Sequence, residues 1–379
     1  MDIIYLDHAA SSFPKPPGVS QAMIEAVEKY AANPGRGTHR LAEQAGGVIE
    51  KTRRMLATKF GVSNPNHVLF FSNATAALNQ ALKGYPFKKG DHVITTSFEH
   101  NSVRRPLEYL KEAAGIDVTY IEGNSANLLE GMKMAMRPET VLLAVSHASN
   151  VTGEVAPLKD MIELAKSKDI KVLVDASQTA GHFPIHMKDE GIDMLAFPGH
   201  KRLLGPQGTG ALLVEGKIEL NPIHHGGTGS FSELPGQPDQ WPERFESGTL
   251  NTPGIAGWHA ALKQLEAIVS RETDLTKLLI QELRMVKDVV IYGEIDGFRM
   301  PVVAFNIGDI PSHEVGMILD SHYGIAVRAG MHCSPTTHVH FGTENQGAVR
   351  ASIGPFTTES DIDALVKAVK EIRDGYLEA

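Results

Sequence analysis

Short apolar runs alternate along the first two thirds of the chain with stretches whose apolar positions recur every three or four residues. The short runs are rich in β-branched residues and predict buried strands, whereas the periodic stretches predict helices. The predicted strands lie within residues 67–72, 92–100, 118–123, 141–149, 171–178, 194–200 and 210–216, and the helices within 19–32, 41–60, 75–84, 101–114 and 157–168. This alternation predicts an α/β fold with a mostly parallel sheet and helices on both faces.

The pattern changes after the last of these strands. Residues 221–249 are rich in Gly, Pro and His and predict a long active-site loop. A helical pattern starts near Pro253, which suits a first helical turn. We expect this helix to lead into a smaller α+β C-terminal domain. The predicted division is a large domain over residues 15–252 and a small domain formed by residues 1–14 together with 253–379.

Composition and charge exclude several classes of partner. The chain has 379 residues, a net charge of −9 and no basic stripe, so nucleic acid is not an expected partner. No apolar run approaches the roughly 20 residues that span a bilayer, and no secretion signal is visible, so no membrane partner is expected. The one cysteine, Cys333, excludes an intramolecular disulfide, and the cytoplasm is the expected compartment.

Two of the predicted strands end near residues of opposite charge. The apolar run 172–174 ends in Asp175, and the run 194–197 is followed closely by Lys201. Parallel sheets bind ligands at the carboxyl ends of their strands. A lysine there can form an imine with the aldehyde of pyridoxal phosphate (PLP), and a carboxylate keeps the pyridine nitrogen protonated. The alternative is a helix-capping Asp175 and a solvated lysine.

Three other strand ends carry polar groups that suit the same cofactor. Thr75 opens a helix whose free amides could bind phosphate, although the segment could equally be an ordinary helix cap. His100 could stack on a flat ring or lie on a surface loop. Asn150 could donate a hydrogen bond to a cofactor oxygen or form a plain turn with Gly153.

The segment 331–340 holds four side chains that can ligate zinc. These are His332, Cys333, His338 and His340. Their spacing fits no zinc-finger or zinc-ribbon pattern and no second cysteine exists, so no metal site is expected. Cys333 is then either a small buried residue or an exposed, reactive thiolate in a loop.

Two arginines of the C-terminal part suit the carboxylate of an amino acid. Arg328 and Arg350 both lie in strand-like segments. A forked guanidinium binds a carboxylate through two parallel hydrogen bonds. The alternative for each is a surface salt bridge, which contributes little.

These segments together resemble the class V aminotransferase-fold PLP enzymes, and within them the cysteine desulfurases and selenocysteine lyases. The resemblance runs from YLDHAA (5–10) to VRASIGPFTTESDID (349–363), and its specific parts are VDASQTAGH, GHK, RFESGTLNTPG and RAGMHC, in that order. It implies the PLP-dependent transferase fold of type I, bound PLP, an amino-acid substrate and a homodimer.

The resemblance also implies a role for each matching residue. Lys201 would be the Schiff-base lysine, Asp175 would pair with the pyridinium nitrogen, and His100 would stack on the ring. The remaining cofactor contacts would be Gln178 and Asn150 at the phenolic oxygen, Ala74, Thr75 and His200 at the phosphate, and Thr249 at the phosphate of the neighbouring subunit. The substrate contacts would be Arg350 at the carboxylate, Arg328 and Asn150 nearby, and His39 and Arg36 on a loop that reaches across the dimer.

Cys333 matches the cysteine that accepts sulfur from the substrate as a persulfide. It lies 17 residues before Arg350, which resembles the subgroup with a short cysteine loop, whose members often use a separate sulfur-acceptor protein. Two positions depart from the family. Pro198 stands where serine is common, which removes a phosphate contact, and Met331 stands where histidine is common, which removes an acid/base group.

The favoured hypothesis is a PLP-dependent cysteine desulfurase that converts L-cysteine or L-selenocysteine to L-alanine. A second hypothesis keeps the fold and the cofactor but changes the reaction to that of an aminotransferase, an epimerase or a β-lyase, since a fold does not fix a function. A third is a sulfur-carrying partner without enzymatic activity, against which the retention of Lys201, Asp175 and Gln178 argues.

Overall fold

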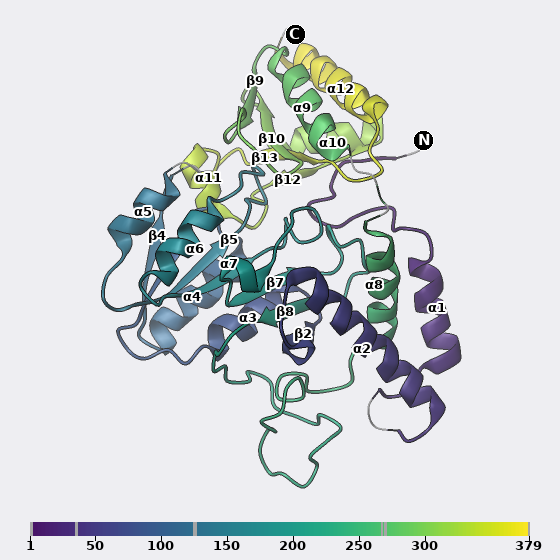
Figure 1. Ribbon diagram of the computed structural model, residues 1–379. Helices are drawn as coiled ribbons and strands as arrows, with labels where there is room; N and C mark the ends of the chain where they lie inside the picture. Colours follow the sequence, from purple (N-terminus) through teal and green to yellow (C-terminus); the bar gives the residue numbers. More distant parts are fainter. Residues whose placement is uncertain (1–2, 35–36, 124–126, 267, 269–270, 378–379) are drawn as a thin grey trace.

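The chain folds into two lobes, each built around its own β-sheet (Figure 1). The computed structural model describes residues 3–34, 37–123, 127–266, 268 and 271–377. Within these ranges, no helix is long and apolar enough to cross a membrane.

The large lobe is organised by a seven-stranded sheet with the order β2-β8-β7-β6-β5-β3-β4. Its strands are β2 (Val68–Phe71), β3 (His92–Thr96), β4 (Asp117–Ile121), β5 (Thr140–Ser146), β6 (Lys171–Asp175), β7 (Met194–Pro198) and β8 (Gly210–Val214). All neighbouring pairs are parallel except those of β8, which runs antiparallel to both β2 and β7. Each strand overlaps a run predicted from the sequence, and only β4 and β5 begin one residue earlier than predicted. The mostly parallel α/β fold is confirmed.

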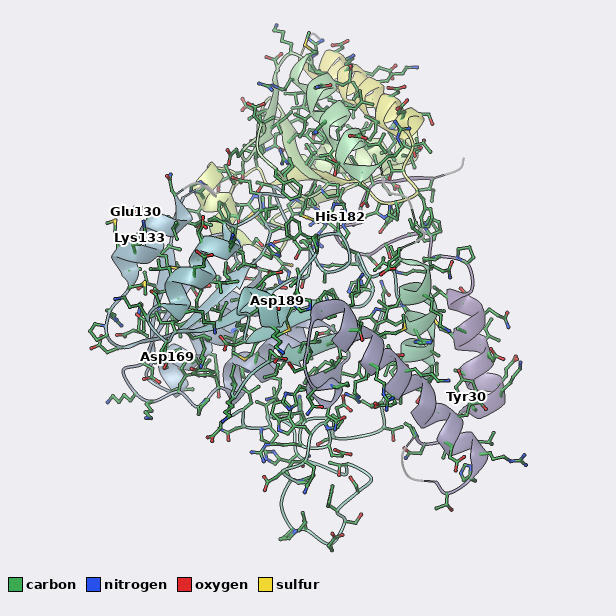
Figure 2. All side chains as sticks on the ribbon, in the orientation of Figure 1. Tyr30, Glu130, Lys133, Asp169, His182 and Asp189 are labelled. Atoms are coloured by element: carbon green, nitrogen blue, oxygen red, sulfur yellow. The ribbon has the colours of Figure 1, made fainter. Side chains whose placement is uncertain are left out.

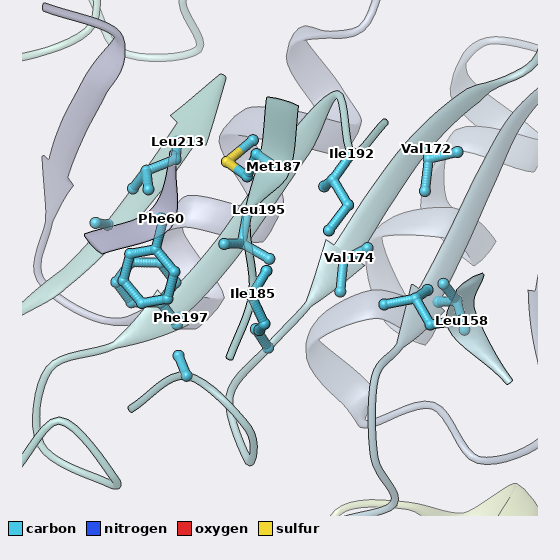
Figure 3. Close-up of a cluster of buried hydrophobic side chains, with 14 of the residues drawn as sticks. Phe60, Leu158, Val172, Val174, Ile185, Met187, Ile192, Leu195, Phe197 and Leu213 are labelled. Carbon is cyan, nitrogen blue, oxygen red and sulfur yellow. The ribbon is translucent and has the colours of Figure 1, made fainter. Parts of the chain in front are cut away.

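Helices cover both faces of this sheet. They are α1 (Val19–Tyr30), α2 (Arg40–Phe60), the 3₁₀ turn η1 (Pro65–His67), α3 (Ala74–Gly84), α4 (Asn101–Ala113), α5 (Leu128–Ala135), α6 (Leu158–Lys166), α7 (Met187–Glu190) and α8 (Thr252–Gln264). One face of the sheet packs with α2, α6 and α7, as Figure 3 shows for Val172, Val174 and Leu195. The intervening Leu173 packs with α3 and α4 on the other face. Burial on both faces explains why the strands read as continuous apolar runs.

The small lobe is an antiparallel four-stranded sheet with the order β12-β13-β10-β9 and helices on one side. Its elements are α9 (Glu272–Arg284), β9 (Val289–Tyr292), β10 (Val302–Ile307), α10 (Ser312–Tyr323), β11 (Ile325–Ala326), β12 (Arg328–Gly330), α11 (Pro335–Phe341), β13 (Ala348–Ser352) and α12 (Glu359–Leu377). The N-terminal strand β1 (Ile4–Tyr5) pairs with β11, and Leu6 is buried in the core of this lobe. The N-terminal segment is therefore packed with the C-terminal lobe.

Helix α8 joins the core of the large lobe. Ile255, Trp258 and Leu262 are buried there, and α8 packs against α1 and α2. Along the chain, Leu275 of α9 is the first helical residue that is buried in the apolar core of the small lobe. The predicted domain boundary at residue 253 lies at the start of α8, and the buried side chains of this helix pack in the core of the large lobe.

Candidate active site

A cavity of about 210 Å³ lies where the carboxyl ends of the central strands meet the small lobe. Residues of both lobes line it. They are Ala9, Ala10, Asn73, Ala74, Thr75, His100, Ser102, Ser146, Ala148, Asn150, Asp175, Ser177, Gln178, Pro198, His200, Lys201, Arg328, His332 and Arg350. The structure thus gathers most of the predicted site residues around one space.

Asp175 faces this cavity from the end of β6, and Lys201 faces it from the loop that follows the neighbouring strand β7. Asp175 is the last residue of β6, is 6% exposed, and accepts a hydrogen bond from the Ser177 amide at 2.9 Å. Burial raises the pKa of Asp175, and the Ser177 contacts and Lys201 oppose this shift. Burial lowers the pKa of Lys201 to about 8, and Asp175 is the main opposing influence. A lysine with such a pKa is partly neutral near pH 7.5 and can accept a proton.

His100 is held in a fixed orientation at the start of α4. Its Nδ1 lies 2.9 Å from the Ser102 hydroxyl and accepts a hydrogen bond from the Ser102 amide at 3.1 Å. The same hydroxyl lies 2.7 Å from that of Thr75, at the start of α3. Burial, followed by the charge of Lys201, lowers the pKa of His100 to about 4. The ring is therefore neutral at physiological pH and can stack on a flat ligand.

Glu99 is a fully buried carboxyl group beneath the cavity that the sequence prediction missed. It accepts hydrogen bonds from the Thr96 hydroxyl at 2.7 Å and from the Ser146 hydroxyl at 2.7 Å. Burial raises the pKa of Glu99 to about 7, although the bonds from Ser146 oppose the shift. The carboxyl group fixes the loop that presents His100 and the end of β5 beside Asp175.

Arg350 enters the cavity from β13 and is held by groups from two other parts of the chain. Its Nη2 donates to Asp7 Oδ1 at 2.8 Å and its Nη1 donates to the Asn150 carbonyl at 2.8 Å. The guanidinium is 1% exposed, and its Nε has no hydrogen-bond partner among the described residues. A carboxylate ligand would satisfy this donor. Asp7 was not predicted, because 343 residues separate it from Arg350.

Cys333 lies beside the cavity in a strained turn. His332 and Cys333 have φ values of +48° and +60°, a region that residues with side chains rarely adopt. The Asn150 amide donates to the His332 carbonyl at 2.8 Å, and Asn150 Oδ1 accepts from the Ser334 hydroxyl at 2.6 Å. The turn therefore presents an exposed thiol that is tied to the large lobe.

Arg328 connects this thiol with the cavity. It lines the cavity from β12, and its Nη2 lies 3.7 Å from Cys333 Sγ. Its guanidinium can hold negative charge that develops on the sulfur. Asn150 has one of its two amide N–H groups occupied by His332, so a single N–H remains for a ligand.

Gln178 and His200 also line the cavity. Gln178 Nε2 donates to the Ala9 carbonyl at 3.2 Å, while its buried Oε1 has no partner within the described ranges. Burial lowers the pKa of His200 to about 4. The His200 carbonyl accepts from the Ser12 amide at 2.9 Å, which joins the N-terminal segment to the lysine loop.

Besides Cys333, which lies beside the cavity, two predicted site residues of the described ranges do not line it, and a third lies outside those ranges. Thr249 is exposed and borders a different hollow beside Phe71 and Glu246, and no residue of the loop 221–249 reaches the cavity of its own chain. His39 is exposed and caps α2, where its Nδ1 accepts from the Ala42 amide at 3.4 Å. Arg36 lies outside the described residues.

The histidines near Cys333 are engaged elsewhere. His332 Nε2 lies 2.9 Å from the Ala348 carbonyl, and His338 Nδ1 lies 2.8 Å from the Thr343 hydroxyl. Among the residues with described positions, no three His, Cys, Asp or Glu side chains are arranged to hold a metal ion.

The cavity has a complementary group for each functional group of PLP. The amine of Lys201 can meet the aldehyde, and the buried carboxyl group of Asp175 can meet the ring nitrogen. Gln178 Oε1 is a buried hydrogen-bond acceptor without a donor among the described residues, and it can meet the phenolic group. The first turn of α3 leaves the amides of Ala74 and Thr75 outside the intrahelical ladder, where they can bind an anion. Pro198 lines the wall without an N–H or a hydroxyl, as its type requires. The residues present therefore fit the cofactor.

Comparison with known proteins gives one consistent family. The model of a family described as aminotransferase class-V matches residues 4–365. A probable cysteine desulfurase of Methanothermobacter thermautotrophicus is 33% identical over 98% of this chain and 95% of its own length. A cysteine desulfurase of Pectobacterium atrosepticum is 33% identical over 98% of this chain and 93% of its own length.

Solved structures are similar over the whole fold. The apo structure of a cysteine desulfurase from Thermococcus onnurineus NA1 has a TM-score of 0.92 at 31% identity and covers 99% of this chain and 95% of that one. The S-sulfonic acid form of the cysteine desulfurase CsdA from Escherichia coli has a TM-score of 0.86 at 28% identity, covering 97% and 94%. Both lobes are thus common to these proteins.

Proposed function

The chain belongs to the aminotransferase class-V family, and from that premise we propose that it is a PLP-dependent cysteine desulfurase. It has the PLP fold of type I, and it takes sulfur from L-cysteine, or selenium from L-selenocysteine, to leave L-alanine. The observation that carries this proposal is the single thiol, Cys333, which contacts Arg328 at the cavity that contains Lys201 and Arg350. A thiol there is suited to receive a sulfur atom.

PLP is the proposed cofactor. Lys201 would hold its aldehyde, Asp175 would hold its ring nitrogen, and His100 would stack on its face. Gln178 and Asn150 would contact its phenolic oxygen. Its phosphate would be bound by Ala74, Thr75 and His200. When bound, PLP supplies an aldehyde that condenses with amines and a ring that accepts electrons from the substrate α-carbon.

Lys201 is the proposed proton carrier. The neutral fraction of an amine with a pKa near 8 is large enough at pH 7.5 to remove the α-proton of a bound amino acid. Asp175 faces the same cavity and stabilises positive charge on Lys201, as its opposing influence on the pKa of the lysine indicates. His100 stays neutral and excludes water from one side of the site.

Arg350 and Cys333 act on the two ends of the substrate. The buried guanidinium of Arg350 binds the carboxylate through its unpartnered Nε and fixes the orientation of the amino acid. The Cys333 thiolate attacks the substrate sulfur, so that a sulfur–sulfur bond forms and the carbon–sulfur bond breaks. The electron pair of the broken bond stays with the carbon, which takes up a proton to become the methyl group of alanine.

A homodimer and a cytoplasmic location are further parts of the proposal. Thr249 is exposed and does not line the cavity of its own chain, which supports a role at the phosphate of a neighbouring subunit. The exposed Cys333 supports delivery of its sulfur to a separate acceptor protein or thiol. A lone thiol that must stay reduced to work suits the reducing cytoplasm.

A second candidate keeps the cofactor and changes the reaction. Met331 and Pro198 stand where acid/base and phosphate-binding groups are common in the family, so an aminotransferase, epimerase or β-lyase acting on another amino acid is the alternative. Formation of an α-keto acid or of a racemised amino acid would identify it.

The experiment is to mix the PLP-saturated protein with L-cysteine and a reducing thiol and to assay alanine and sulfide. Equal amounts of the two products are expected, and Cys333→Ala is expected to lose most of both. Undiminished turnover by this variant would remove Cys333 from the mechanism. Comparison with L-selenocysteine, cysteine sulfinate and alanine, by absorbance, would then identify the preferred substrate.

A further inference from the structure

Glu272 is the first residue of α9 in the small lobe, yet its side chain is buried at the junction between the lobes. Its two carboxylate oxygens contact different partners. Oε1 accepts from Arg202 Nη1, and Oε2 lies 2.7 Å from His182 Nδ1. Figure 2 labels His182 at this junction, below the small lobe. One carboxylate therefore bridges two loops of the other lobe.

Both of these loops carry residues of the cavity. Arg202 directly follows Lys201. His182 lies in the loop after β6, which begins just past Asp175 and contains Gln178. The loops also touch through their backbones. Gly181 has a φ of +95°, and a Cβ atom there would lie 2.8 Å from the Arg202 carbonyl oxygen. The separation of the lysine and its facing carboxylate therefore depends on how these two loops are held together.

The same bridge leads to the arginine proposed for the substrate. Arg202 Nη2 lies 3.5 Å from the Pro301 carbonyl, just before β10. Strand β10 pairs with β13, with Ala304 opposite Arg350. The bridge thus connects the lysine loop to the strand that supplies Arg350.

We propose that Glu272 is a positioning residue for the amine of Lys201. A buried ion pair adds little net stability, because desolvation offsets the Coulomb attraction, but it selects one arrangement of the groups it joins. Here that arrangement holds Arg350 and Arg328 of the small lobe near Lys201. Without the bridge, the two lobes separate at this point and Lys201 becomes more exposed.

The expected consequence has a definite sign. Burial, Arg350 and Arg328 all lower the pKa of Lys201. Loss of a negative charge near an amine lowers the pKa of that amine, so the change in charge at Glu272 cannot by itself raise the pKa of Lys201. Loss of the bridge should raise the pKa of Lys201, because Arg350 and Arg328 move away from the amine and water reaches it.

The test compares wild type with Glu272→Gln, and with Asp274→Asn as the matched control. Asp274 is an exposed carboxylate in the same first turn of α9. The pKa of Lys201 is measured in the full-length cofactor-free protein from the pH dependence of its acetylation, read by mass spectrometry of the Lys201 peptide. Glu272→Gln is expected to move this pKa upward by about half a unit or more, while Asp274→Asn leaves it unchanged.

Turnover gives a second measurement, which depends on the proposed desulfurase activity. Glu272→Gln is expected to lower kcat with L-cysteine by about tenfold or more, with a smaller change in KM. Glu272→Asp, which restores the charge, is expected to recover part of both effects. If Glu272→Gln does not fold, the same two measurements are made on His182→Ala. This variant removes the His182 contact of Glu272 and leaves the Arg202 contact in place.

An unchanged pKa of Lys201 together with wild-type kcat would overturn the proposal. A lower melting temperature without either change would overturn it as well, since Glu272 would then only join the lobes. Failure of the wild-type enzyme to form alanine from L-cysteine would refute the desulfurase activity instead, and the acetylation comparison would still decide the role of Glu272.

Discussion

Replacement of Asp7 by asparagine should have opposite effects on stability and on substrate binding. Asp7 holds the buried guanidinium of Arg350 at 2.8 Å, and its own side chain is 21% exposed. Asparagine keeps an oxygen that can accept the same hydrogen bond but removes the charge. A hydrogen bond between charged groups contributes roughly 1.5–3 kcal/mol and a neutral one roughly 0.5–1.5. We therefore expect the free energy of unfolding to fall by about 1–2 kcal/mol.

Substrate binding should improve, because Asp7 and the carboxylate of L-cysteine compete for Arg350. Two carboxylates about 5 Å apart on one guanidinium repel each other by roughly 3 kcal/mol at an effective dielectric constant of 20, and partial exposure of Asp7 reduces this. A gain of about 0.7–1.4 kcal/mol corresponds to a KM roughly three- to tenfold lower.

Urea unfolding of the cofactor-free protein and initial rates of alanine formation measure the two effects. Asp320→Asn, which changes an exposed carboxylate on α10, is the control and should alter neither. A higher KM in a folded Asp7→Asn variant would refute the reasoning, because it would mean that Asp7 orients Arg350 for the substrate. Increased stability would refute the assigned ion pair.

Four further changes have expected outcomes. Lys201→Ala should abolish the borohydride-stable attachment of PLP and the turnover of L-cysteine, as checked by mass spectrometry and alanine assay; retained attachment would contradict the assignment. Because burial lowers the pKa of Lys201 to about 8 and only the neutral amine accepts a proton, kcat should rise with pH below about 8 and level off above it; a fall over that interval would contradict this role. Arg350→Met should raise KM for L-cysteine by about tenfold or more with a smaller change in kcat, measured from initial rates over a wide substrate range. Pro198→Ser adds a hydroxyl to the cavity wall and should tighten PLP binding by about three- to tenfold in fluorescence titration; an unchanged Kd would show that this wall does not face the phosphate.

The sequence predicts the sheet well because its strands are buried on both faces. Val172, Leu173 and Val174 contribute to two different cores, so an uninterrupted apolar run marks the strand and its end marks the cavity. Asp175 and Lys201 could be paired for the same reason, since neighbouring parallel strands end on one side of the sheet.

Contacts between distant segments are not visible in such patterns. Asp7 follows a two-residue strand and carries no local sign that it meets Arg350. Glu272 looks like any acidic residue in the first turn of a helix, where the helix dipole favours negative charge. Only the contacts of its side chain with Arg202 and His182 distinguish it from the exposed Asp274. Ser102 is an exception, because a hydroxyl two residues after His100 at a helix start is a local pattern that could have been noticed.

The presence of one exposed cysteine among 379 residues also limits the stoichiometry of sulfur transfer. Each subunit can store one transferable sulfur atom, and no second protein thiol is available to relay it onward. Without an external thiol, a first mixing with L-cysteine should therefore release a burst of one alanine per subunit and then stall.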